Sequence, residues 1–220
     1  MVHLYTASGA IMAFLGLVAV SRRDAREAFL WMVAATVVDS TDGLFARRAQ
    51  VRLHLPWVDG AKLDDIVDYL TFVFLPAYLV YQFRMVPDGA ALPVVATMLL
   101  SSAFGFSATD AKTADHFFKG FPSYWNIVVF YLYALGVIPL LSAVVLLGFA
   151  ALVFVRIAYI YPSRTPTWRA LTLVLGAAWA CAVAACAWML PHQPKALLIG
   201  SLVFPIYYVG LSLKLQRSRP

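Results

Sequence analysis

Six of the eleven acidic residues of this chain lie between Asp39 and Asp68, in an otherwise apolar setting. Carboxylates near the hydrocarbon of a membrane are costly and are usually kept for a function. Asp39 and Asp42 are three residues apart, and Asp64 and Asp68 are four apart, so each pair shares one face of a helix. Four converging carboxylates could not all stay ionised without cations, because like charges raise one another's pKa. The pattern predicts a site for Mg²⁺ or Mn²⁺, which prefer oxygen ligands and leave positions open for phosphate.

Small residues and an arginine accompany the two pairs at helical spacing. Gly43 directly follows the first pair and Ala46 comes one turn later, so a ligand could approach the helix backbone at both. Gly60 lies one turn before the second pair, with the same consequence. Arg47 offers a planar guanidinium to phosphate oxygens. The combination predicts close phosphate binding beside the metal.

The alternative is that the aspartates only cap helices and solvate an interface. Asp59 and Asp65 lie in the same stretch but outside the two pairs, and for them this alternative is retained. It is rejected for the pairs, because a long spaced pattern that includes Arg47 is far more specific than a short motif.

The composition indicates which elements hold these residues. Hydrophobic residues make up 62 % of the chain and charged residues 13 %, with a mean hydropathy of +0.79; a water-soluble domain has roughly 25 % charged residues. We predict an all-α, polytopic membrane helical bundle of about eight transmembrane helices. We expect one domain over residues 1–220, with core helices at about 4–160 and two additional helices at about 169–213. The apolar segments, each near the ~20 residues that span a bilayer, are 4–20, 28–46, 63–83, 90–109, 124–138, 139–159, 169–190 and 196–213.

The basic residues divide unequally between the two ends of these helices. If the loop that holds Arg47 is cytoplasmic, alternation places twelve of the seventeen lysines and arginines on that side. This agrees with the positive-inside rule and predicts that the aspartates and both termini are cytoplasmic. One loop, with Arg22, Arg23 and Arg26, goes against the rule.

The motif resembles the signature of the CDP-alcohol phosphatidyltransferase family, D-x2-D-G-x2-A-R followed after a spacer by G-x3-D-x3-D. Twelve residues separate the two halves here, where eight is the commonest spacing. The segments 55–74 and 110–133 and the eight-span layout are similar to the bacterial phosphatidylcholine synthase branch. All fixed positions of the signature are filled, by Asp39, Asp42, Gly43, Ala46, Arg47, Gly60, Asp64 and Asp68.

This resemblance implies a reaction. CDP-diacylglycerol would bind with its diphosphate at a two-metal site of Mn²⁺ or Mg²⁺ and its acyl chains in the bilayer. The choline hydroxyl would attack the phosphorus that carries diacylglycerol, releasing CMP and giving phosphatidylcholine. The resemblance also implies a homodimer in the bacterial inner membrane, and we expect no nucleic-acid partner.

Site roles follow from position in the motif. Asp39, Asp42 and Asp64 would be metal ligands, and Asp68 would be both a ligand and the general base, because an alkyl hydroxyl is a poor nucleophile until its proton leaves. The residues expected to bind the CDP portion or its phosphates are Gly43, Ala46, Arg47, Gly60, Thr6, Ser8, Lys112 and Lys119.

Choline carries a quaternary ammonium that cannot donate a hydrogen bond. Aromatic faces and carboxylates would therefore recognise it, at ~0.5–2 kcal/mol per cation–π contact. Aromatic residues near a membrane surface also form interfacial belts, which is the competing interpretation. The candidates for choline binding are Tyr69, Tyr124, Trp125 and Asp110.

Two other functions remain open at this point. Serine, glycerol phosphate or inositol phosphate could replace choline, although an anionic acceptor should require a basic cluster facing the metals. A cation transporter is a more distant alternative, because transport sites usually lie near the bilayer midplane on interrupted helices.

Overall fold

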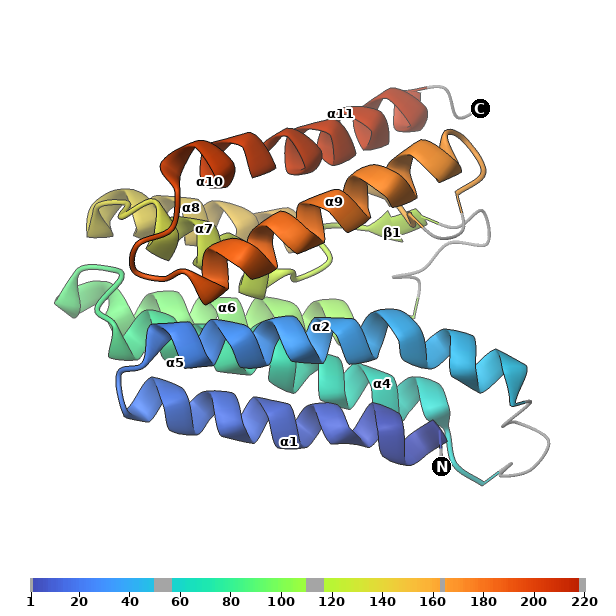
Figure 1. The fold of residues 1–220 in the computed structure, drawn as a ribbon, viewed down its shortest axis with the longest axis horizontal. Coiled ribbons are helices and arrows are strands. Elements are labelled where there is room, and N and C mark those ends of the chain that lie inside the picture. The colour runs from blue at the N-terminus through green and yellow to red at the C-terminus, as the bar shows by residue number, and fades with distance from the viewer. Residues whose placement is uncertain (1, 50–56, 110–116, 163–164, 218–220) are drawn as a thin grey trace.

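The computed structural model describes residues 2–49, 57–109, 117–162 and 165–217 (Figure 1). The chain is built almost entirely from helices. Asp24 lies in the connection between the first two helices. Its side chain accepts a 2.8 Å hydrogen bond from the Glu27 N–H and so caps the N-terminus of the second helix. The longer helices are α1 (Val2–Ser21), α2 (Ala25–Arg48), α4 (Gly60–Asp68), α5 (Leu75–Gln82), α6 (Ala91–Ser107), α7 (Trp125–Ala134), α8 (Pro139–Phe154), α9 (Arg169–Trp188), α10 (Lys195–Ser201) and α11 (Val203–Arg217).

Apolar helices long enough to cross a membrane make this a helical membrane protein. Five helical stretches of the described chain meet that criterion by length and composition, and two further apolar helices, α7 and α8, are shorter. The expected total of about eight crossings is therefore not confirmed by helix length. The five stretches are Val2–Ser21, Ala25–Arg48, Asp88–Ser107, Arg169–Trp188 and Lys195–Arg217.

The third expected span is continuous but irregular. A π-helical segment, Tyr69–Phe74, joins α4 to α5, and Pro76 follows in the first turn of α5. Proline has no N–H to donate to the preceding turn, and a widened turn is one way in which a helix absorbs that loss. The π segment begins directly after Asp68, so it lies beside the predicted site.

A small antiparallel ribbon departs from the all-α expectation. Strand β1 (Phe117–Lys119) pairs with β2 (Ala158–Ile160), with Phe117 opposite Ile160. The helix expected over 139–159 is thus too long, since α8 ends at Phe154. The last turn of α8 is closed by tertiary contact: the Phe121 N–H donates to the Leu152 carbonyl at 2.9 Å.

Gly120 allows that contact. Its φ of +80° is a conformation that residues with a side chain rarely adopt, and a Cβ there would collide with the Val153 carbonyl oxygen. The segment after β1 therefore lies directly on the end of α8.

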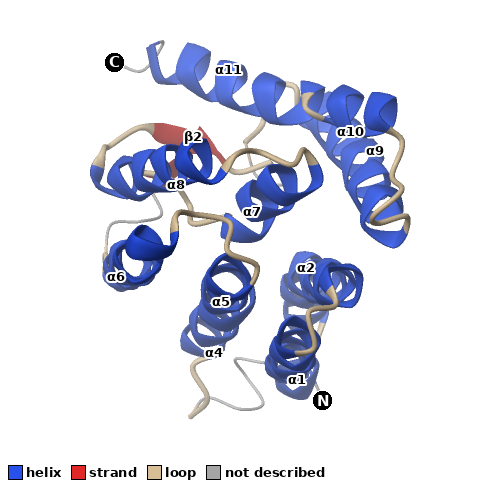
Figure 2. Ribbon diagram, turned by 90° about the vertical axis from the view of Figure 1, so that its left-hand side faces the viewer, coloured by secondary structure: helices blue, strands red, loops and turns tan. Residues whose placement is uncertain are grey.

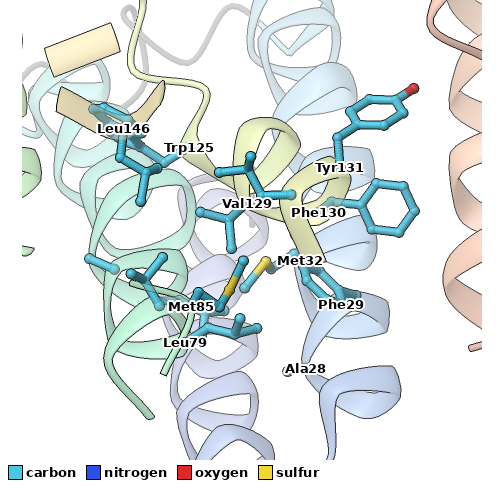
Figure 3. Close-up of a cluster of buried hydrophobic side chains, with 14 of the residues drawn as sticks. Ala28, Phe29, Met32, Leu79, Met85, Trp125, Val129, Phe130, Tyr131 and Leu146 are labelled. Atoms are coloured by element: carbon cyan, nitrogen blue, oxygen red, sulfur yellow. The ribbon is translucent and has the colours of Figure 1, made fainter. Parts of the chain in front are cut away.

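Helix α7 occupies the centre of the hydrophobic core. Figure 3 shows Trp125 and Val129 of α7 among side chains from the surrounding helices. Trp125 and Val129 are fully buried, and so are Leu79 of α5 and Leu146 of α8, while Phe29 of α2 is nearly so. The start of α7 is consequently held between the helices that carry the aspartates and the rest of the bundle.

Two glycines bring α1 close to the helix that carries Asp64. A Cβ on Gly9 would lie 2.5 Å from the Val67 Cγ1, and a Cβ on Gly16 would lie 2.5 Å from the Leu75 Cδ2. Any larger residue at these positions would push α1 away from α4 and α5. The close approach sets the spacing between α1 and the aspartate-bearing helices.

The ends of the chain lie at one end of the bundle. Figure 1 shows the N-terminus, the C-terminus, the end of α2, the start of α4 and strand β1 at the same end of the long axis. Seen from the side in Figure 2, α9, α10 and α11 lie beyond α7, away from α1 and α4. Helices α1, α2 and α4 thus pack together on the other side of the bundle.

Candidate metal and phosphate site

Three of the predicted carboxylates meet between α2 and α4. One carboxylate oxygen from each of Asp39, Asp42 and Asp64 can be chosen so that all three lie within 4.8 Å of one another. Asp42 is buried, with 7 % of its surface exposed, and the other two are half-buried. A close set of hard oxygen donors of this kind can bind a divalent cation.

Helix α1 holds one of these ligands in place. The Thr6 hydroxyl donates a 2.7 Å hydrogen bond to the Asp42 Oδ2, and both residues are buried. The neighbouring residue on each helix makes a second link, a 2.8 Å hydrogen bond between the hydroxyls of Tyr5 and Thr41. Two consecutive residues of α1 thus align α2 at the carboxylate cluster.

Asp68 lies outside the three-residue group. It is the last residue of α4, one turn beyond Asp64 and directly before the π segment. Tyr124, the residue before α7, makes an edge contact with Phe72 of the π segment. Asp68 is therefore one turn away from Phe72, the residue that Tyr124 contacts.

The small residues of the motif have different surroundings. A Cβ on Gly43 would lie 3.2 Å from the Arg47 Nη1, so the guanidinium folds back over this glycine. A Cβ on Gly60 would lie 2.9 Å from the His3 Cε1, so this glycine admits a side chain of α1. Ala46 is half-buried one turn after Gly43. Arg47 is exposed and positioned beside the bare backbone at Gly43.

Asp59 caps a helix, as the alternative reading expects for a residue outside the two pairs. Its Oδ1 accepts hydrogen bonds from the N–H groups of Ala61 at 3.1 Å and Lys62 at 3.2 Å, at the start of α4. This fixes where α4 begins and hence where Asp64 lies.

The other residues expected to contact CDP are spread around the cluster. The Thr6 hydroxyl donates its hydrogen to Asp42, and the Ser8 hydroxyl donates to the Tyr5 carbonyl of its own helix at 2.6 Å. Lys119 is half-buried in β1. Lys112 and Asp110 lie outside the described residues.

The three candidate rings for choline differ in position. Trp125 is fully buried and donates a 2.7 Å hydrogen bond to the Ser102 hydroxyl. The Tyr69 hydroxyl donates to the Leu99 carbonyl at 2.9 Å. Tyr124 makes an edge contact with Phe72, with the ring centroids 6.2 Å apart.

A shallow, open depression that the sequence does not mark lies at the end of the α1–α2 pair. It has a volume of about 460 Å³ and is lined by Val2 and Tyr5 of α1, and by Phe45, Arg48 and Ala49 at the end of α2. Only the helical register of α1 against α2 places these residues together, so no motif in the sequence marks it.

The fold and the site define a class: a helical membrane protein with an oxygen-donor metal site and an arginine at one end of its bundle. No family model matches the chain. Individual relatives do match, among them three proteins named phosphatidylcholine synthase. The protein from Legionella pneumophila is 44 % identical over 165 residues, covering 74 % of this chain and 64 % of the relative. The protein from Pseudomonas aeruginosa is 37 % identical over 178 residues, covering 81 % and 75 %.

A third relative, from Mesorhizobium japonicum, is 40 % identical over 186 residues, covering 84 % of this chain and 69 % of the relative. The matches thus span roughly two thirds to three quarters of the relatives' own length. The chain belongs to the phosphatidylcholine synthase family, and the resemblance drawn from the aspartate motif is confirmed.

Proposed function

We propose that this protein transfers the phosphatidyl group from CDP-diacylglycerol to choline, giving phosphatidylcholine and CMP. The observation that carries the proposal is the meeting of Asp39, Asp42 and Asp64 within 4.8 Å at the end of a membrane bundle. Membership of the phosphatidylcholine synthase family supplies the substrates.

The three carboxylates would hold Mg²⁺ or Mn²⁺, and a two-metal arrangement would add Asp68. When bound, such cations neutralise phosphate charge and stabilise the entering and leaving oxygens of a displacement. The Thr6 hydrogen bond keeps the Asp42 carboxylate oriented toward its neighbours.

Asp68 would act as the general base. It would accept the choline hydroxyl proton as the hydroxyl oxygen forms a bond to the phosphorus that carries diacylglycerol. The bond from that phosphorus to the bridging oxygen of the diphosphate breaks, and CMP leaves with the electron pair. Its position outside the three-residue group, directly before the π segment, suits a residue that faces the acceptor.

The nucleotide would lie on the opposite side of the cluster. Arg47, folded over Gly43, is placed to form a bidentate contact with a phosphate. The remaining members of the proposed CDP and phosphate set are Ala46, Gly60, Thr6, Ser8, Lys112 and Lys119.

For choline we propose Tyr124 as the first aromatic contact, because its ring contacts Phe72 one turn after Asp68. Tyr69, Trp125 and Asp110 complete the set proposed from the sequence. Because the Trp125 ring is fully buried, it would form the inner wall of the choline site.

In the membrane, we propose about eight crossings in the bacterial inner membrane, with the site and both termini cytoplasmic. The end of the bundle that the termini share with the end of α2 and the start of α4 in Figure 1 supports this layout. A homodimer is proposed on the family resemblance.

The test is an acceptor-resolved assay with purified protein, CDP-diacylglycerol, Mn²⁺ or Mg²⁺, and labelled choline or serine. We expect labelled lipid from choline only, with no product after chelation and full recovery on adding the metal back. Lipid product from serine but not from choline would contradict the proposal.

A further inference from the structure

A buried amide near the carboxylates has an oxygen without a partner. Asn126, the second residue of α7, is 7 % exposed, and its Oδ1 has no hydrogen-bond partner among the described residues. An unpaired polar atom in a membrane protein core is destabilising, and such atoms are usually satisfied by water or a ligand. Asn126 therefore needs an explanation other than packing.

The orientation of this amide is determined by Thr36 of α2. The Thr36 hydroxyl donates its single hydrogen to the Met32 carbonyl at 2.9 Å, so toward Asn126 it can only accept. The Asn126 Nδ2 donates to that hydroxyl at 3.3 Å. The amide must present its nitrogen to α2, and its carbonyl oxygen is left to face another group.

This amide lies close to the reactive end of the bundle. Thr36 is three residues before Asp39, about 4.5 Å along the same helix and on the same face. Tyr124, two residues before Asn126, makes an edge contact with Phe72, which lies one turn after Asp68. The start of α7 thus places an aromatic ring and an unpaired carbonyl oxygen next to the carboxylate cluster.

We propose that Asn126 and Tyr124 form the acceptor subsite, in which the Asn126 Oδ1 faces the quaternary ammonium and sets the preference for choline. The proposal rests on the proposed function. The choline hydroxyl is engaged at Asp68, so the trimethylammonium end must lie away from the metals, toward the interior. The partial negative charge of an amide oxygen attracts that cation without requiring a donor, and the tyrosine ring adds a cation–π contact.

A second amide on the other side of the molecule provides a matched control. Gln193 also has a buried side-chain oxygen without a partner among the described residues. Its Nε2 donates to the Ala134 carbonyl at 2.8 Å, at the opposite end of α7. Gln193→Leu therefore removes the same chemistry far from the cluster.

The test compares Asn126→Leu with Gln193→Leu in purified protein. We expect Asn126→Leu to raise the KM for choline by about tenfold, the loss of one favourable cation contact, and to lower the choline-over-ethanolamine ratio of kcat/KM. The KM for CDP-diacylglycerol should stay within about twofold of the wild-type value. Gln193→Leu should change neither KM, because Gln193 lies far from the proposed choline contact.

A choline KM that is unchanged in Asn126→Leu, or that rises in parallel with the KM for CDP-diacylglycerol, would overturn the subsite while leaving the proposed function intact. If Asn126→Leu does not fold, Tyr124→Phe should keep the choline KM and Tyr124→Leu should raise it; equal values would overturn the subsite. Wild-type protein that makes no phosphatidylcholine from choline would overturn both proposals.

Discussion

The Asp42 carboxylate is the most buried member of the cluster, and it depends on a neighbour in another helix. Thr6 donates to it across the α1–α2 interface, where the two residues are each 7 % exposed. Partners of this kind commonly change metal affinity by about 10–100-fold when they are removed. Thr6 therefore positions a ligand in addition to any contact with the nucleotide.

Thr6→Val keeps the shape of the side chain and removes its donor. We expect the Mn²⁺ concentration for half-maximal binding to rise by about tenfold or more, while Thr6→Ser, which keeps a hydroxyl, should stay near the wild type. Direct Mn²⁺ binding measured by electron paramagnetic resonance checks this without turnover. Equal affinities in Thr6→Val and wild type would show that the bond does not orient Asp42.

Asp68→Asn should abolish turnover while CDP-diacylglycerol and metal still bind, because an amide cannot take the proton of the acceptor. Asp59→Asn is the control, since asparagine caps a helix about as well as aspartate. Phosphatidylcholine formation and CMP release measure the turnover of both variants, and Mn²⁺ binding shows whether the metal is still held. Near-normal turnover in Asp68→Asn, with loss in Asp59→Asn, would mean that the motif has been read in the wrong register.

The residue pattern predicted that four carboxylates converge, because each pair shares one face of a helix; the structure groups three of them, Asp39, Asp42 and Asp64. The pattern could not place Asp68 relative to that group, since this depends on how α4 packs against α1 and α2. It also missed Asn126, because a single asparagine in an apolar segment shows its unpaired oxygen only when its neighbours are known.

At the scale of the elements, the site depends on how closely α1 approaches α4 and α5. Gly16 contacts Leu75, which is fully buried, and Gly9 contacts Val67. The apolar segments predicted most helices within a few residues. The π turn after Asp68 and the end of α8 at Phe154 were not predicted, because both are set by tertiary contacts and by the constraint at Pro76.

Gly16→Ala should destabilise the protein by about 1–3 kcal/mol, because the added methyl would overlap the Leu75 side chain in a packed core. Gly148→Ala in α8 is the matched control, since an added Cβ there meets nothing within 4 Å. Thermal unfolding in detergent measures both. A melting temperature of Gly16→Ala at or above that of Gly148→Ala would contradict the close packing of α1.

At the scale of the whole molecule, both termini, the end of α2, the start of α4 and strand β1 share one end of the bundle (Figure 1). The unequal charge distribution predicted this common side, although it could not show that a ribbon closes it. The same end is the one expected to meet cytoplasmic choline and CMP.

Reporter fusions test the orientation. Alkaline phosphatase fused after residue 220 should be inactive and a fluorescent protein there should fold, since both report a cytoplasmic end. The same reporters inserted at Gly136, in the turn between α7 and α8, should give the reverse result. An active phosphatase at the C-terminus would contradict a cytoplasmic site.

The most direct test of the central claim compares Asp64→Asn with Asp65→Asn, two adjacent aspartates of which only the first belongs to the cluster. In purified protein, Mn²⁺ binding and choline-dependent CMP release are measured side by side. We predict that Asp64→Asn loses metal affinity and at least about 100-fold in CMP release, because the metal's stabilisation of the leaving oxygen is lost, while Asp65→Asn keeps both. Wild-type metal binding and CMP release in Asp64→Asn would contradict it.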